Sequence, residues 1–420
     1  MKDRRNAQDS RFTGRRHIRP RSALVQTLSS FPRVACAMAL CVAAAHSVVA
    51  QTTMRDSAGV QIIETRLRGA PKSAFSVSDK PIADFGGEST DSLAEFFAPV
   101  AGAVRLRDGR IVVGLGAPAH ALRLFDANGR YVSTLARRGQ GPGELPFAPV
   151  GLTLLPGDTI VVLGSPRIVL FGPTGAGLGI EAYPRGGLNQ AVFEGGGLLT
   201  MQRITAESLI VYRRIPRATR GVSADTGIRL ATASMNSVGL DFRGSDGSRA
   251  TFLHQRPFIP SLRIAVAGDN VIMGDGTTFE IREYDATAKL RRIIRRDADL
   301  TLRHAHIAAH RQGVFFPGML PEVRQLHERW LAGVKFPKNV PAYSELRVDR
   351  TGRIWAREYP LAASAPTHWS VFGRDGAFLG TADTPNDLAI REIGADYILG
   401  TRRDADGFNH VRLYSVAPSR

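Results

Sequence analysis

The sequence predicts an all-β fold, a six-bladed β-propeller with a helical insertion between blades four and five. Two observations carry this prediction. An internal repeat recurs six times along the chain, and the 43 glycines in 420 residues suit an architecture with many turns. The composition, 43% hydrophobic and 22% charged, is that of a globular protein. We therefore expect one large β-rich domain.

Each copy of the repeat reads as an apolar strand, a turn that contains Gly or Asp, and a second apolar strand. The turn centres lie near residues 109, 157, 196, 269, 352 and 395. Three of the spacings, 48, 39 and 43 residues, match a four-stranded propeller blade, which is about 40–50 residues long. A third strand that ends near an aromatic residue follows each copy, as at residues 122–125.

The two longer spacings, 73 and 83 residues, predict insertions at about 213–260 and 297–342. Residues 241–253 read as outer strands of blade three plus a loop, although this gap could also hold a degenerate seventh blade. Residues 301–311 and 321–331 have helical spacing, and Pro321 suits a first helical turn. Leu326, Trp330 and Leu331 can form one apolar face. We expect these two helices to cover one mouth of the ring.

The chain divides into three parts. Residues 1–50 form a signal peptide, 51–97 an N-terminal segment with a ring-closing strand, and 98–420 the propeller. Strands are expected at 60–65 and 75–85. One of them completes the last blade, because closing the ring removes the exposed edges of an open sheet.

The signal-peptide prediction rests on residues 1–50. This segment contains nine Lys or Arg and two Asp, followed by an apolar run and by small residues before a cleavage site after Ala50. Both cysteines, Cys36 and Cys41, lie in this segment. We expect a periplasmic or secreted protein with no transmembrane segment in the mature chain. Arg15-Arg16 fits a twin-arginine signal poorly, and the export route stays open.

Of the net charge of +17, the segment carries +7, which leaves about +10 spread over the mature chain, so nucleic acid is not an expected partner.

A glycine-rich loop at residues 137–144 follows the first predicted hairpin, whose turn holds Asn128-Gly129. Its glycines and Pro142 predict a crossover into the next blade. Its charged side chains could pin that crossover between blades or bind a ligand. The candidate binding residues are Arg137, Arg138, Gln140, Glu144, His120 and Arg167.

Residues 98–180 resemble NHL-repeat propellers. The likeness rests on Leu122-Arg-Leu-Phe-Asp126, Gly129 and Gly139-Gln-Gly-Pro-Gly-Glu144, while Gly172-Pro-Thr-Gly175 departs from the usual acidic turn. More broadly, residues 60–416 are similar to bacterial secreted proteins described as six-bladed β-propellers. The resemblance implies the fold and carries over no catalytic residue.

Two functions follow from the sequence. The first is a non-catalytic binding or scaffold module for a protein, peptide or polysaccharide ligand, because no nucleophile elbow, phosphate loop or dinucleotide motif is present. The alternative is a metal-assisted hydrolase or lyase, lactonase-like, with Ca or Zn in the central channel. His304, His306 and His310 are weak metal candidates, since His306 and His310 share a helix face but no His-Glu-x-x-His motif surrounds them.

Overall fold

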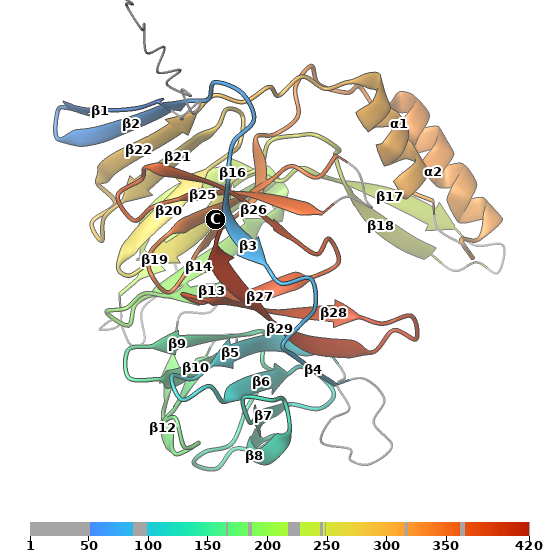
Figure 1. Ribbon diagram of the computed structural model, residues 1–420. Coiled ribbons are helices and arrows are strands. Elements are labelled where there is room, and N and C mark those ends of the chain that lie inside the picture. Colours follow the sequence, from blue (N-terminus) through green and yellow to red (C-terminus); the bar gives the residue numbers. More distant parts are fainter. Residues whose placement is uncertain are drawn as a thin grey trace, which may run out of the picture. The chain divides into compact units, whose positions relative to one another are not determined.

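The computed structural model describes residues 51–86, 99–164, 167–183, 187–216, 227–243, 247, 249–315, 318–361 and 366–419. They all belong to one unit, Val48–Arg420. This part of the chain consists of β-strands with two short α-helices and one 3-10 turn, Thr205–Glu207 (Figure 1). The all-β class is therefore confirmed. The predicted signal peptide lies outside the described residues.

Three sheets consist of four sequential antiparallel strands each. The first holds β5 (Val100–Arg105), β6 (Ile111–Leu115), β7 (Ala121–Phe125) and β8 (Tyr131–Arg137). The second holds β9 (Gly151–Leu155), β10 (Thr159–Leu163), β11 (Arg167–Phe171) and β12 (Gly177–Ala182). The third holds β13 (Leu188–Val192), β14 (Leu198–Ile204), β15 (Leu209–Ile215) and β16 (Ile228–Ser234).

Two larger sheets contain the same four-stranded unit with N-terminal strands added. The six-stranded sheet holds β19 (Arg263–Ala267), β20 (Asn270–Gly274), β21 (Glu280–Tyr284) and β22 (Leu290–Arg296), extended by β2 (Val60–Arg66) and β1 (Gln51–Ser57). The nine-stranded sheet holds β23 (Tyr343–Val348), β24 (Ile354–Glu358), β25 (Thr367–Phe372), β26 (Phe378–Thr384), β3 (Ser73–Val77), β29 (Asn409–Pro418), β28 (Tyr397–Arg403) and β27 (Ala389–Ile393), with β4 (Ala83–Gly86) beside β29.

Each of the six repeated segments folds as an antiparallel hairpin. The hairpins are β5–β6, β9–β10, β13–β14, β19–β20, β23–β24 and β27–β28. The third strand of each copy pairs antiparallel with the second. The predicted order of strand, turn, strand and third strand is confirmed in all six copies.

The first strands of the repeats follow one another in a closed circuit. β5 lies beside β9, β9 beside β13, β13 beside β19, β19 beside β23, and β27 beside β5. The remaining step is bridged by the Arg350 amide, which donates a 3.1 Å hydrogen bond to the Ile393 carbonyl. The arrangement is propeller-like.

The buried apolar side chains gather between neighbouring sheets. One cluster, for example, joins Trp355 and Trp369 of β24 and β25 to Ile398 of β28. Another joins Phe125 of β7 to Val411 of β29. Burying one such side chain contributes about 1.5–3 kcal/mol, so each sheet is stabilised by the neighbour on either side.

The turn between β7 and β8 shows how local sequence forms these hairpins. The Asp126 carboxylate accepts hydrogen bonds from the amides of Asn128 and Arg130, at 2.9 and 2.8 Å. Only Gly129, and not Asn128, takes a positive φ, of 84°. A Cβ on Gly129 would lie 2.4 Å from the Phe85 ring, so close packing against β4 also requires glycine.

The first insertion differs from the prediction. Residues 241–253 do not add outer strands to the third sheet. Instead they contribute to β17 (Ser237–Arg243) and β18 (Arg249–Gln255), which form a two-stranded sheet and, among the described residues, pair with no other strand. The outer strands of the third sheet are β15 and β16, because the segment before β17 already completes that sheet.

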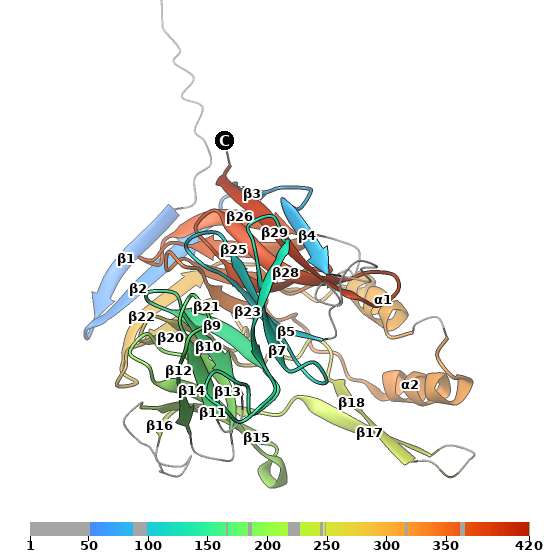
Figure 2. The ribbon, with the colours of Figure 1, turned by 90° about the horizontal axis from the view of Figure 1, so that it is seen from below.

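The second insertion contains α1 (His304–Gly313) and α2 (Pro321–Gly333), and Pro321 stands in the first turn as predicted. The buried line of α2 is Val323, His327 and Leu331 rather than Leu326, Trp330 and Leu331. Helix α2 lies beside β17, as Figures 1 and 2 both show.

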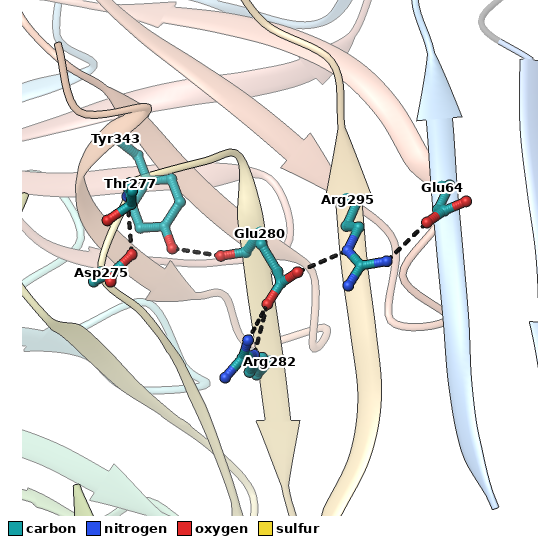
Figure 3. A network of polar contacts seen from close by, with 7 residues as sticks. All are labelled: Glu64, Asp275, Thr277, Glu280, Arg282, Arg295 and Tyr343. Carbon is teal, nitrogen blue, oxygen red and sulfur yellow. Dashed lines mark hydrogen bonds and ion pairs between the residues drawn. The ribbon is translucent and has the colours of Figure 1, made fainter. Parts of the chain in front are cut away.

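The N-terminal strands join two different sheets. β4 pairs antiparallel with β29, whereas β2 pairs parallel with β22. Figure 3 shows the polar contacts behind the second junction, where the Arg295 guanidinium lies between Glu280 of β21 and Glu64 of β2. Burial alone would raise the pKa of Glu280, but hydrogen bonds from Arg295 and Arg282 outweigh it and lower that pKa.

Candidate ligand-binding cavity

A cavity of about 960 Å³ lies among the first strands of the repeats. Residues of β5, β9, β13, β19, β23 and β27 line it, together with the turns that follow these strands. Small-molecule pockets in proteins measure about 300–1,000 Å³, so this volume suits a small ligand.

Strand β23 supplies one charged pair to the wall. Glu345 and Arg347 are two residues apart and therefore share a face of the strand, while Leu346 between them is buried in the core. The Arg347 Nε donates a 2.6 Å hydrogen bond to Glu345 Oε1. Arg357 of β24 lies 3.7 Å from the other oxygen of the same carboxylate.

Arg391 enters the cavity wall from β27. The pairing of β27 with β28 shifts register between Ile390 and Glu392, so Arg391 is the extra residue of a β-bulge. Its Nε donates a 3.1 Å hydrogen bond to Thr401 Oγ1, and its Nη2 donates one of 3.1 Å to the Val100 carbonyl.

No carboxylate in the described part of the chain forms an ion pair with Arg391. Burial lowers its pKa, and the neighbouring Arg347 guanidinium adds to the effect. Both causes act because a guanidinium charge is unfavourable without water or a counter-charge.

Arg263 of β19 is a third arginine in the lining. Its Nε is buried and has no hydrogen-bond partner among the described residues. A buried donor without a partner costs about 1–3 kcal/mol.

The turns at one end of the cavity are tied together by Glu392. Its carboxylate accepts a 2.7 Å hydrogen bond from the Arg105 amide and another from the Arg350 guanidinium. Burial raises the pKa of Glu392, although Arg350 opposes the shift. At the same end Asp158 accepts a 2.9 Å hydrogen bond from the Arg107 amide.

The arrangement can bind anions. Guanidinium groups present planar, permanently charged donors that match the oxygens of carboxylate and phosphate groups. The described residues include no group of three or more His, Cys, Asp or Glu placed to hold one metal ion. The metal-assisted hydrolase, with Ca or Zn, stays a prediction.

The glycine-rich loop lies between β8 and β9, away from the cavity lining. Glu144 Oε2 accepts a 2.6 Å hydrogen bond from the Gly141 amide, and a Cβ on Gly139 would lie 1.9 Å from that oxygen. Glu144 therefore stabilises the loop itself. Arg137 and Arg138 are exposed, and within the described ranges neither pairs with Glu144.

The other predicted binding residues lie in the glycine-rich loop or at the start of a nearby strand. Gln140 is exposed in the same loop, and Arg167 is the exposed first residue of β11. His120 precedes β7 with a φ of 42°, and its Nδ1 is buried without a hydrogen-bond partner in the described structure. None of these residues lines the cavity, and their role in binding stays a prediction.

The three histidines of α1 have separate surroundings. His304 is exposed, and His306 Nδ1 accepts a 3.2 Å hydrogen bond from the Arg303 amide at the start of the helix. The His310 ring packs edge-on against Phe258, with ring centres 5.4 Å apart, and burial lowers its pKa.

Sequence reasoning missed Glu345, Arg347, Arg391 and Arg263. One signal was present: charged residues on the first strand of a repeat, where the other positions are apolar. No spacing rule could group them, because they come from three repeats.

No family model matches the sequence, and no curated protein matches it significantly. Many solved structures align with the chain. A protein from Bacteroides fragilis described as exported is 11% identical, with 86% of this chain and 100% of that chain covered and a TM-score of 0.42.

Two further solved structures also align with most of the chain. A member of the DUF4221 family from Bacteroides vulgatus is 9% identical, with 83% and 99% of the chains covered and a TM-score of 0.43. The calcium-binding protein regucalcin from Agrobacterium tumefaciens is 11% identical, with 83% and 97% covered and a TM-score of 0.33. Separately, none of the helices in the described ranges is long and apolar enough to cross a membrane.

Proposed function

We propose that the protein is an exported six-bladed β-propeller that binds a small ligand in the cavity enclosed by its first strands, as a non-catalytic module of the cell envelope or the extracellular space. The observation that carries the proposal is the cavity itself, with charged side chains presented from β19, β23 and β27.

Six blades are supported by three features of the described residues: six repeated hairpins, a closed circuit of first strands, and apolar clusters between neighbouring sheets. In this account β4 is the outer strand of the sixth blade, and the helices are inserted between blades four and five. A ring of this kind presents its first strands to a common axis, where a ligand meets residues from several blades.

Export is supported by the sequence of residues 1–50, with its basic start, apolar run and small residues before Ala50. Intact-mass and N-terminal analysis of the exported protein tests this part. A mature N-terminus at Gln51 is expected, and an uncleaved N-terminus contradicts the assignment.

Ligand binding is tested by native mass spectrometry of residues 51–420 incubated with a small-molecule extract of the cell envelope. Thr153→Trp places a bulky ring in the cavity from β9, at a residue that forms part of the lining. Thr205→Trp, at an exposed residue outside the lining, is the matched control.

The expected result is a bound mass on the wild type and on Thr205→Trp that is absent from Thr153→Trp. A wild type that retains no small molecule contradicts the proposal. So does a bound mass that survives Thr153→Trp, because the ligand then lies elsewhere.

A further inference from the structure

The charged side chains of the cavity lining balance in number, six arginines against six carboxylates, but they are unevenly distributed among the strands. Three arginines on the first strands line the cavity: Arg263, Arg347 and Arg391. Of these, Arg347 is paired with a carboxylate, that of Glu345. Glu392 binds Arg350 and the Arg105 amide instead, and so does not compensate the others. The strand wall thus has more guanidinium than carboxylate charge.

Arg391 is held in place by neutral groups. Thr401 is buried, with 4% of its surface exposed, and its hydroxyl accepts from Nε, while the Val100 carbonyl accepts from Nη2. These two contacts use two of the five N–H donors of the guanidinium. The remaining donors have no partner among the described residues, and the orientation of the group is already set.

An anion bound beside Arg391 relieves two unfavourable contributions to the free energy, desolvation and charge repulsion. A half-buried guanidinium without a counter-charge has lost part of its hydration, which the two neutral acceptors of Arg391 replace incompletely. In addition, the charges of Arg391 and Arg347, on the first strands of two consecutive repeats, repel each other. An oxyanion bound to Arg391 and close to the Arg347 charge reduces this repulsion and supplies acceptors for the remaining Arg391 donors.

We propose that the cavity recognises its ligand through an oxyanion, a carboxylate or phosphate group, which Arg391 binds directly and Arg347 attracts from β23. This inference rests on the proposed function and names the class of ligand. The cavity volume of about 960 Å³ limits that ligand to a small molecule or the end of a larger one.

Arg263 lies in the same lining and adds positive charge on the β19 side of the cavity. Glu345 retains acceptor capacity beside Arg347 and can accept from a ligand hydroxyl. The oxyanion therefore orients a molecule whose remaining polar groups contact β19 and β23.

Isothermal titration calorimetry of residues 51–420 tests this with citrate and with inorganic phosphate, each compared with chloride at equal ionic strength. The two arms distinguish a carboxylate from a phosphate source. Arg391→Gln removes the charge and keeps a polar side chain. Arg403→Gln removes an exposed arginine from the same repeat and is the matched control.

We expect at least one of the two anions to bind, and Arg391→Gln to weaken that binding by on the order of tenfold or more, as for loss of a charge-assisted hydrogen bond. Arg403→Gln leaves the affinity unchanged. If Arg391→Gln fails to fold, Thr153→Trp replaces it, since the blocked cavity must then exclude the anion.

Two results overturn the inference. One is that neither anion binds more tightly than chloride, and the other is that binding persists in Arg391→Gln or in the blocked cavity. If native mass spectrometry still finds a neutral molecule that Thr153→Trp displaces, the proposed function stands and only the oxyanion assignment fails.

Discussion

The Arg295 guanidinium donates a 2.8 Å hydrogen bond to the carboxylate of Glu64, and this contact joins the N-terminal hairpin to the edge of the β19–β22 sheet. The two strands that carry these residues, β2 and β22, run parallel and are paired along their length. Residues far apart in the sequence thus form one continuous sheet (Figure 3).

This pair predicts a specific pH dependence. The hydrogen bond from Arg295 lowers the pKa of Glu64 below its ordinary value of 4.5. A lowered folded-state pKa contributes stability above pH 4.5 that is lost as the pH falls through the folded value. The pair is exposed, so its contribution is below about 1 kcal/mol.

Urea unfolding of the wild type and Glu64→Gln at several pH values measures this contribution. The difference in unfolding free energy is expected to be largest near pH 7 and to shrink on acidification. A difference that stays constant from pH 7 to pH 3 shows that the pair does not stabilise the fold.

Glu392 predicts the opposite pH dependence. Because burial raises its pKa, the folded protein binds this proton more tightly than the unfolded chain does. Relative to Glu392→Gln, the wild type therefore gains stability as the pH falls from neutrality toward 4.5. The same urea series checks the sign, and a gain on raising the pH contradicts it.

Removing the Glu392 side chain is expected to lower the free energy of unfolding by more than the pH change does. Glu392→Ala leaves the Arg105 amide and the Arg350 guanidinium without their acceptor, and a loss of about 3 kcal/mol in unfolding free energy is expected. Glu194→Ala, at an exposed turn of the same cavity, serves as control and should change stability by less than about 0.5 kcal/mol.

The glycine-rich loop is tested by a double-mutant cycle. Gly139→Ala places a methyl group where the Glu144 carboxylate lies and displaces it from the Gly141 amide. The expected cost is about 1–2 kcal/mol in the wild type and less in a Glu144→Ala background. Equal costs in the two backgrounds would show that the Glu144 side chain is not the reason why position 139 requires glycine.

The arginines of that loop are expected to behave differently from Glu144. Arg137 and Arg138 are exposed, so replacing both with Ala should change the unfolding free energy by less than about 0.5 kcal/mol. Thermal denaturation measures this directly. A large fall in melting temperature would instead establish that the arginines pin the crossover between repeats.

The sequence predicted the repeats because their signals are local. An Asp or Gly in the turn and apolar residues on both sides specify each hairpin, as Asp126 and Gly129 do for β7 and β8. The helices were predicted for the same reason, since Pro321 and the helical spacing lie within one segment.

The cavity and the insertions depend on long-range pairing, which no local pattern records. Residues 241–253 have strand-like sequence, but nothing in it says that they pair with each other and not with β15 or β16. Arg391 meets Thr401 within its own hairpin, but it meets Val100 only because the last repeat lies beside the first. Such contacts follow from topology, so the arginine cluster could not be read from spacing.

The central claim, that the cavity binds an oxyanion, is tested most directly by a crystal structure of residues 51–420 grown or soaked with selenate, whose selenium gives an anomalous signal. We expect an anomalous peak inside the cavity, with selenate oxygens within hydrogen-bond distance of the Arg391 guanidinium. Anomalous peaks confined to exposed arginines on the outer strands, with an empty cavity, would contradict it.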